Sequence, residues 1–212
     1  MAASTMLRTT VLLVRHGATP TTGLVLPGRA PGLHLADTGV AQAERVAGRL
    51  AEVGVDALYT SPMERAVETA APTASALGLD VRVEDGLTEC DFGSWTGEKL
   101  ADLAVLPAWQ DVQRTPSTFR FPGGESFVEL QERMVGAIER VRDRHAGGVV
   151  ACFSHADPIK VALAHALGTP LDHFQRLHVG PGSVSAIVFA DGQPPTVPVV
   201  NSTHDPLIGL GG

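Results

Sequence analysis

The chain has 212 residues and a formal net charge of -7, from 16 Lys and Arg residues against 23 Asp and Glu residues. The length favours a single domain, and 44% hydrophobic residues against 18% charged ones are typical of a folded chain with a core and not of a disordered one. The acidic balance argues against a nucleic-acid binder, which needs a basic face to neutralise phosphates.

Strand and helix patterns alternate along the chain. Short apolar runs predict strands, and apolar residues at spacings of three and four predict amphipathic helices. In chain order the predicted elements are a strand at 11–14, a helix at about 37–53, a strand at 56–60, a helix at about 61–78, a strand near 81–83, a helix at about 126–145, a strand at 149–153, a helix at about 157–167 and a strand at 183–190. This alternation predicts an α/β fold, a three-layer sandwich with a mostly parallel central sheet flanked by helices.

Local signals refine some of these elements. Ser61 and Glu64 have the spacing of a capping box, which predicts the start of the second helix, and Pro72 predicts a kink or restart within it. The charged face of the third helix is interpreted as a solvated surface. After Asp191 the chain is rich in Pro and Gly, so we expect an edge strand at most around residues 196–200 and a flexible tail from about residue 200.

Several features bear on the compartment. Arg15 ends the first apolar run, so the amino terminus lacks the apolar stretch of a secretory signal. No window is apolar enough over sufficient length to predict a membrane-spanning helix. Cys90 and Cys152 are too few for a disulfide framework. We therefore expect a cytoplasmic protein with neither a membrane nor a nucleic acid as its partner.

Chemically distinctive side chains follow three of the predicted strands. Arg15 and His16 come directly after the first strand, Arg65 lies in the first helical turn after the second, and His155 follows the strand at 149–153. Because ligands bind at the carboxyl ends of the strands in open α/β sheets, we expect these four side chains to converge. Arginine forks suit phosphate oxygens, so the sequence predicts an anion site.

A histidine beside two arginines is expected to stay neutral, because nearby positive charge disfavours its protonation. A neutral imidazole can accept a phosphoryl group while the other cationic groups stabilise its oxygens. Departure of the alcohol then needs an acid. The candidates are Glu89, Asp91 and Glu98, with Glu89 preferred because it follows the predicted strand near 81–83.

Other chemistries fit less well. A metal site could combine the two histidines with Asp157 and Glu89, but two arginines in the same pocket would oppose a cation. Ser154 and Cys152 are disfavoured as nucleophiles because neither lies in a Gly-x-Ser-x-Gly elbow or a Cys-x-x-Cys motif.

Six of the ten aromatic residues crowd into one stretch of the chain. A satellite core under a loop and the wall of a substrate pocket are equally good interpretations of this stretch. The six residues are Phe92, Trp95, Trp109, Phe119, Phe121 and Phe127.

Six motifs occur in a fixed order. They are Arg15-His16-Gly17 with Thr19, Gly28-Arg29, Ser61-Pro62 with Arg65-Ala66, Glu89-Cys90-Asp91-Phe92-Gly93, Phe121-Pro122-Gly123-Gly124-Glu125-Ser126 and Ser154-His155. Over about residues 11–189 this set resembles the histidine phosphatase superfamily, also called the phosphoglycerate mutase-like family. Ala18, Thr22 and Ala156 depart from the commonest form of its motifs, but none of the three departures removes a catalytic group.

The resemblance implies a phosphoglycerate mutase-like fold, with a single domain over residues 1–212 and a small cap at about 92–128. It implies a phosphohistidine at His16, a phosphate pocket of Arg15, Arg65 and His155, and Glu89 as the proton donor. It implies no metal and no organic cofactor. The further substrate contacts that we predict are Gly17, Thr22, Gly28, Trp95 and Lys99.

Within this family the short aromatic middle segment favours a metal-independent phosphomonoesterase acting on a small phosphorylated metabolite, with free phosphate as the other expected ligand. Two alternatives remain: phosphoryl transfer of the phosphoglycerate mutase type, and a protein that binds a phosphorylated ligand without turnover. A homodimer through the apolar run at 183–190 or through the tail is also left open.

Overall fold

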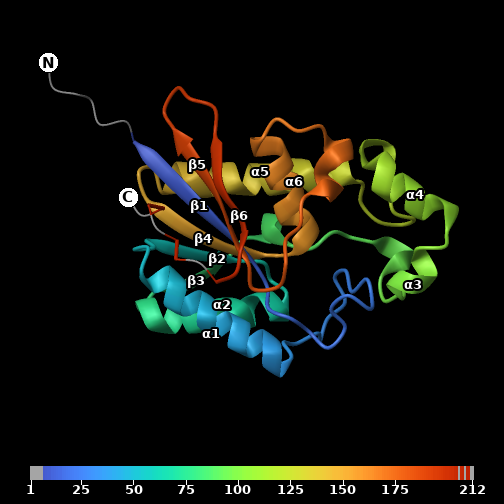
Figure 1. The fold of residues 1–212 in the computed structure, drawn as a ribbon, viewed down its shortest axis with the longest axis horizontal. Coiled ribbons are helices and arrows are strands. Elements are labelled where there is room, and N and C mark those ends of the chain that lie inside the picture. The colour runs from blue at the N-terminus through green and yellow to red at the C-terminus, as the bar shows by residue number, and fades with distance from the viewer. Residues whose placement is uncertain (1–6, 205, 208, 211–212) are drawn as a thin grey trace, which may run out of the picture.

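The computed structural model describes residues 7–204, 206–207 and 209–210. They form three layers, with α1 and α2 on one face of a sheet and α5 and α6 on the other (Figure 1). The helices are α1 (Asp37–Ala51), α2 (Glu64–Leu77), α3 (Leu100–Leu103), α4 (Pro107–Arg114), α5 (Phe127–Arg144) and α6 (Ala156–Ala166). The 3-10 helices are η1 (Asp85–Leu87), η2 (Gly93–Trp95), η3 (Pro116–Thr118) and η4 (Leu171–Arg176).

The sheet has six strands in the order β3-β2-β4-β1-β5-β6. They are β1 (Arg8–Arg15), β2 (Ala57–Thr60), β3 (Val81–Val83), β4 (Val149–Ser154), β5 (Val184–Ala190) and β6 (Thr196–Ser202). The first four strands in the chain pair in parallel, whereas β5 and β6 are antiparallel additions. The predicted α/β sandwich with a mostly parallel sheet is therefore confirmed.

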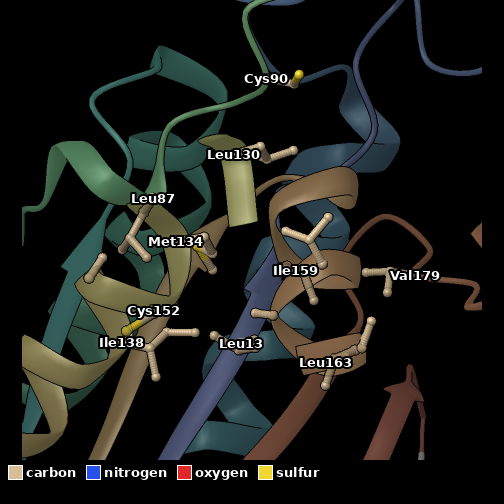
Figure 2. Packing of buried hydrophobic residues seen from close by; sticks show 14 of the residues in the cluster. Leu13, Leu87, Cys90, Leu130, Met134, Ile138, Cys152, Ile159, Leu163 and Val179 are labelled. Atoms are coloured by element: carbon tan, nitrogen blue, oxygen red, sulfur yellow. The ribbon is translucent and has the colours of Figure 1, made fainter. Parts of the chain in front are cut away.

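Each face of the sheet carries its own apolar core, because alternate residues of a strand point to opposite faces. Leu13 and Cys152 pack towards Met134 of α5 and Ile159 of α6 (Figure 2). Leu12, their neighbour in the chain, belongs to the cluster under α1 and α2. Strands covered on both faces are apolar throughout, which is why β1 and β4 could be predicted from short apolar runs.

The start of α2 differs from the predicted capping box. The helix begins at Glu64 after an N-cap at Met63, and it runs unbroken through Pro72. Ser61 Oγ lies 2.8 Å from His155 Nε2, and Glu64 Oε1 accepts a hydrogen bond from the backbone N–H of Gly32 at 2.9 Å. The capping-box prediction was wrong because tertiary partners occupy both side chains.

Part of the tail is structured. β6 pairs with β5 and forms one edge of the sheet, and Leu207 and Leu210 are buried in the core on the α1 and α2 side. Residues 205, 208, 211 and 212 lie outside the described residues, so the predicted flexibility there stays a prediction. β5 is paired on both sides, by β1 and β6, so the two edges of the sheet are β3 and β6.

The segment between β3 and α5 holds η1, η2, α3, α4 and η3. Its helices α3 and α4 lie beyond one end of the sheet, away from the two helical layers (Figure 1). The division into one domain with a cap at about 92–128 remains a prediction. What this segment does is bring aromatic side chains near the carboxyl ends of β1 and β4.

Candidate active site

Two histidines meet at the carboxyl ends of β1 and β4. The strands are paired in parallel, with Arg15 opposite Ser154, so His16 and His155 both follow the last paired residues. The His16 backbone N–H donates to the Ser154 carbonyl at 3.0 Å, and the two imidazole centroids lie 5.2 Å apart. Parallel pairing thus brings together residues separated by most of the chain.

His16 is held as a neutral imidazole. Its Nδ1 lies 2.7 Å from the Gly17 carbonyl oxygen, which can only accept, so Nδ1 carries the proton and Nε2 keeps its lone pair. Burial, reinforced by the charges of Arg65 and Arg15, lowers the pKa of His16 to about 3. The ring therefore presents an unprotonated nitrogen over the neutral and mildly acidic pH range.

Arg65 is buried and Arg15 is half-buried, and each has buried donor atoms without a hydrogen-bond partner. Arg65 is fully buried and donates through Nη2 to the Gly28 carbonyl at 2.9 Å, but its Nε and Nη1 have no partner. Arg15 donates through Nη1 to the Val179 carbonyl at 2.6 Å, and its Nε has no partner. Buried donors without partners are costly, so these guanidinium groups suit an anion that satisfies them.

His155 has one satisfied and one free ring nitrogen. Its Nε2 lies 2.8 Å from Ser61 Oγ. The Ser61 hydroxyl is fully buried and has no other acceptor among the described contacts, so it donates to His155 Nε2, and the imidazole proton lies on Nδ1. Nδ1 is buried without a hydrogen-bond partner. Burial and the nearby Arg65 hold the pKa of His155 well below its usual range.

Glu89 lies beside this free nitrogen, with its Oε2 3.9 Å from His155 Nδ1. Its Oε1 accepts a hydrogen bond from the Cys90 backbone N–H at 2.8 Å. Burial, with a smaller contribution from Asp157, raises the pKa of Glu89 to about 7 against the opposing effect of Arg65. The carboxyl group can therefore carry a proton near neutral pH, as a general acid must.

Charged residues hold the backbone at Glu89. Arg29 and Glu125 belong to the motifs of the sequence, whereas sequence reasoning missed Arg133. Arg133 of α5 donates to the carbonyl oxygens of Thr88 at 2.7 Å and Glu89 at 2.9 Å. Arg29 donates to the same Glu89 oxygen at 2.8 Å. Glu125 Oε1 accepts from both guanidinium groups, at 2.6 Å from Arg133 and 3.1 Å from Arg29. At Arg133, the interpretation of the charged face of α5 as merely solvated was wrong.

A cleft of about 290 Å³ opens onto part of this arrangement. Arg15, His16, Glu89 and the predicted contact Thr22 line it, whereas the fully buried Arg65 and His155 are not among the described residues of its lining. A larger cleft of about 530 Å³ lies near the start of β1. Among the described residues, none of these four lines the larger cleft, so the smaller one holds the candidate site.

Two predicted substrate contacts are structural glycines. Gly17 donates its N–H to Thr69 Oγ1 at 3.0 Å, and a Cβ there would lie 2.4 Å from the Gly39 carbonyl oxygen. Gly28 has a φ of +51°, and a Cβ there would lie 2.8 Å from Thr96 Oγ1. Neither is among the described residues that line the cleft. Close backbone approach explains both glycines.

Two further predicted contacts, Trp95 and Lys99, are also not among the described residues that line the cleft. Trp95 is buried and packs against Trp109 and Phe121, with ring centroids at 6.2 and 5.5 Å. Lys99 is exposed and pairs through its backbone with Val25. The aromatic stretch does not form a separate satellite core, because its buried members belong to the apolar cluster on the α5 and α6 face of the sheet. Four of its residues also line the cleft, as the alternative interpretation predicted: Phe92, Trp109, Phe121 and Phe127.

In the part of the chain that the structure describes, no three or more His, Cys, Asp or Glu side chains gather in a group that could hold a metal ion. None of the described helices has both the length and the apolar character needed to cross a bilayer.

The fold and this arrangement define a class: an α/β protein with a buried pocket of paired histidines and arginines at the carboxyl edge of its sheet. The chain matches the model of the histidine phosphatase superfamily (branch 1) over residues 11–202. It therefore belongs to the histidine phosphatase superfamily, and the resemblance drawn from its motifs is confirmed.

Known relatives are similar along most of the chain. It is 38% identical over 205 residues to the bifunctional protein Rv2228c of Mycobacterium tuberculosis, a match that covers 92% of this chain but 54% of the relative, so the chain spans about half of that relative's length. It is 32% identical over 183 residues to phosphoserine phosphatase 1 of Hydrogenobacter thermophilus, covering 84% of this chain and 85% of the relative. A solved structure of mycobacterial glucosyl-3-phosphoglycerate phosphatase Rv2419c superposes with a TM-score of 0.84 at 25% identity, covering 92% and 99% of the two chains.

Proposed function

We propose that this chain is a metal-independent phosphomonoesterase that hydrolyses a small phosphorylated metabolite through a phosphohistidine at His16. The observation that carries the proposal is the set of buried donors without partners on Arg15, Arg65 and His155, gathered around the neutral His16. An anionic phosphoryl group would satisfy these donors. The phosphatases among the relatives of the chain support the same reaction class.

In the first step, His16 Nε2 attacks phosphorus. The N–P bond forms while the bond from phosphorus to the ester oxygen breaks, and the departing oxygen takes the proton of Glu89 to leave as the alcohol. Arg15, Arg65 and the Nδ1–H of His155 donate to the phosphoryl oxygens. The protonated state of Glu89 below about pH 7 suits this step.

In the second step, water replaces the imidazole. The Glu89 carboxylate takes a proton from the attacking water, the new oxygen bonds to phosphorus and the N–P bond breaks. Inorganic phosphate leaves, and His16 regains its lone pair. The protons balance over the cycle because Glu89 gives one in the first step and recovers one in the second.

The test is hydrolysis of p-nitrophenyl phosphate by wild type and His16→Ala, with and without EDTA. We expect turnover that survives EDTA and is lost in the variant, and a radiolabelled phosphoryl group trapped on wild type by rapid acid quench. Activity abolished by EDTA would overturn the metal-independent mechanism.

Two further assays identify the two alternatives, a phosphoglycerate mutase and a protein that binds its ligand without turnover. Interconversion of 3-phosphoglycerate and 2-phosphoglycerate faster than release of phosphate would identify a mutase. Calorimetric binding of phosphate without hydrolysis of any ester would identify a protein that only binds its ligand.

A further inference from the structure

The outer part of the cleft, where the alcohol portion of a substrate would lie, differs in charge from the phosphate pocket. We propose that it accepts phosphomonoesters of uncharged alcohols with a flat apolar portion, and that it discriminates against esters whose alcohol portion carries a carboxylate or a second phosphate. This inference rests on the proposed function and names its substrate class.

The first observation is an apolar wall. Half-buried Trp109 and buried Val112 of α4 face the same cleft as the buried rings of Phe92, Phe121 and Phe127. Burial of a flat hydrocarbon or aromatic surface against these side chains is favourable in proportion to the apolar area removed from water. A charged group placed against the same wall would lose hydration and gain no partner.

The second observation concerns cations. Among the described residues that line this cleft, Lys160 is the one cationic side chain besides Arg15. Its Nζ donates to Asp157 Oδ1 at 3.0 Å and to Gln175 Oε1 at 2.6 Å, and it lies over the Phe174 ring at 5.1 Å. The lysine side chain is 13% exposed and that of Asp157 19%. The positive charge of Lys160 is thus offset by Asp157, and its ammonium group is already hydrogen-bonded, so it is a poor partner for a second anionic group of a substrate.

The third observation concerns the two carboxyl groups that line the cleft, those of Asp157 and Glu89. Asp157 holds the ammonium group of Lys160, and Glu89 carries a proton below about pH 7, so neither leaves a free cation beside it for an anionic substituent. Such a substituent would meet an apolar wall and a charge pair that is already satisfied, and its burial there would cost hydration without gaining a partner. Phosphoserine and 3-phosphoglycerate, which each carry a carboxylate, are therefore expected to be poor substrates.

Uncharged polar groups have partners here. Gln113 and Gln175 line the cleft, and the oxygen of Gln175 is taken by Lys160, which leaves its amide N–H groups as donors. In an alcohol portion with a flat ring that bears a carbonyl or hydroxyl group, the ring would pack against the apolar wall. The carbonyl or hydroxyl group would hydrogen-bond to the amides of Gln113 and Gln175.

The experiment compares two esters of nearly equal shape, 4-carbamoylphenyl phosphate and 4-carboxyphenyl phosphate, at pH 6, where the second carries an additional charge. We expect kcat/KM to be at least about tenfold higher for the carbamoyl ester, since an unpaired charge in a partly buried site costs at least about 1.4 kcal/mol. Equal kcat/KM values for the two esters would overturn the inference.

A matched pair of variants sharpens the test. Gln113→Lys adds a cation to the cleft, whereas Gln110→Lys adds the same charge to the same helix at an exposed position outside the described lining. Gln113→Lys should raise kcat/KM for the carboxy ester relative to the carbamoyl ester, and Gln110→Lys should leave the ratio as in wild type. Identical ratios in both variants would contradict the inference.

Failure of the proposed reaction can be told apart from failure of this inference. Calorimetric binding of the two esters to His16→Ala reads the same preference without turnover. If wild type hydrolyses neither ester but the carbamoyl ester binds more tightly, the proposed phosphatase reaction is refuted and the proposed charge discrimination is supported. If wild type hydrolyses both esters equally well, the phosphatase reaction is supported and the charge discrimination is refuted.

Discussion

The floor of the cleft and its outer part are built from different kinds of segment. At the floor, the parallel pairing of β1 and β4 places Arg15, His16 and His155, and the first turn of α2 carries Arg65. The outer part comes from the segment between β1 and α1, from the segment between β3 and α5, and from α6 with η4. In the proposed reaction the floor binds the phosphoryl group and carries out the chemistry, whereas the outer part contacts the alcohol portion and so sets the substrate specificity.

The difference also appears in charge. The floor holds guanidinium and imidazole nitrogens whose hydrogen bonds are unmet, while the outer part pairs Lys160 with Asp157. A site with unmet buried donors gains most when an anion arrives, and a site with paired charges gains most from an uncharged surface. The variants below separate these two regions, from the largest expected effect to the smallest.

Arg65→Gln tests the floor. It removes a fully buried guanidinium whose Nε and Nη1 have no partner, so we expect kcat/KM for p-nitrophenyl phosphate to fall by about 10³ or more. Arg8→Gln, at the exposed amino end of β1, is the control for loss of one positive charge and should retain wild-type activity. A loss below tenfold in Arg65→Gln would remove this residue from the phosphate pocket.

Glu89 tests the proton donor. Because its pKa is raised to about 7, kcat/KM for an alkyl phosphate should be level below pH 7 and fall with increasing pH above it, as the acid loses its proton. Glu89→Gln should lose about 10²–10⁴ with the alkyl ester and much less with p-nitrophenyl phosphate, whose leaving group needs little protonation. Equal losses for both esters would assign the acid role to another residue.

Arg133→Lys tests the support of that acid. The substitution keeps the charge but not the fork that reaches the carbonyls of Thr88 and Glu89, so we expect about a tenfold loss with an alkyl phosphate. In a Glu89→Gln background the same substitution should cost nothing further, because it acts through Glu89. Arg140→Lys, on the same helix and paired with Glu84, is the control. Additive losses in the double variant would show that Arg133 acts independently of Glu89.

Trp109→Ala tests the apolar wall and should have the smallest effect. The side chain is half-buried at the cleft, so KM for phenyl phosphate should rise by about tenfold or less with little change in kcat. Inhibition by inorganic phosphate, which needs only the floor, should be unchanged. Weaker inhibition by phosphate in this variant would show that the two regions are not separate.

Prediction from the sequence worked where a local signal reports burial or a strand end. The apolar runs of β1 and β4 report strands covered on both faces, and the polar residues after them mark the edge where His16 and His155 meet. It failed at Ser61, because the capping pattern is local whereas the hydroxyl bonds to His155, 94 residues away. The close approach of other atoms to Gly17 and Gly28 was likewise not foreseen, since sequence alone does not show which backbone needs the space; their contact with a substrate stays a prediction.

The sequence by itself determined the α/β class, most of the strands, the order of the motifs and the four side chains of the floor, because strand periodicity and residue chemistry are properties of short segments. Only the tertiary structure decided what surrounds them. It folded Arg133 of α5 onto the backbone of Glu89, turned Trp109 rather than Trp95 towards the cleft and paired Lys160 with Asp157. Those contacts join segments that are remote in the chain or depend on how helices pack, and no local pattern encodes such packing.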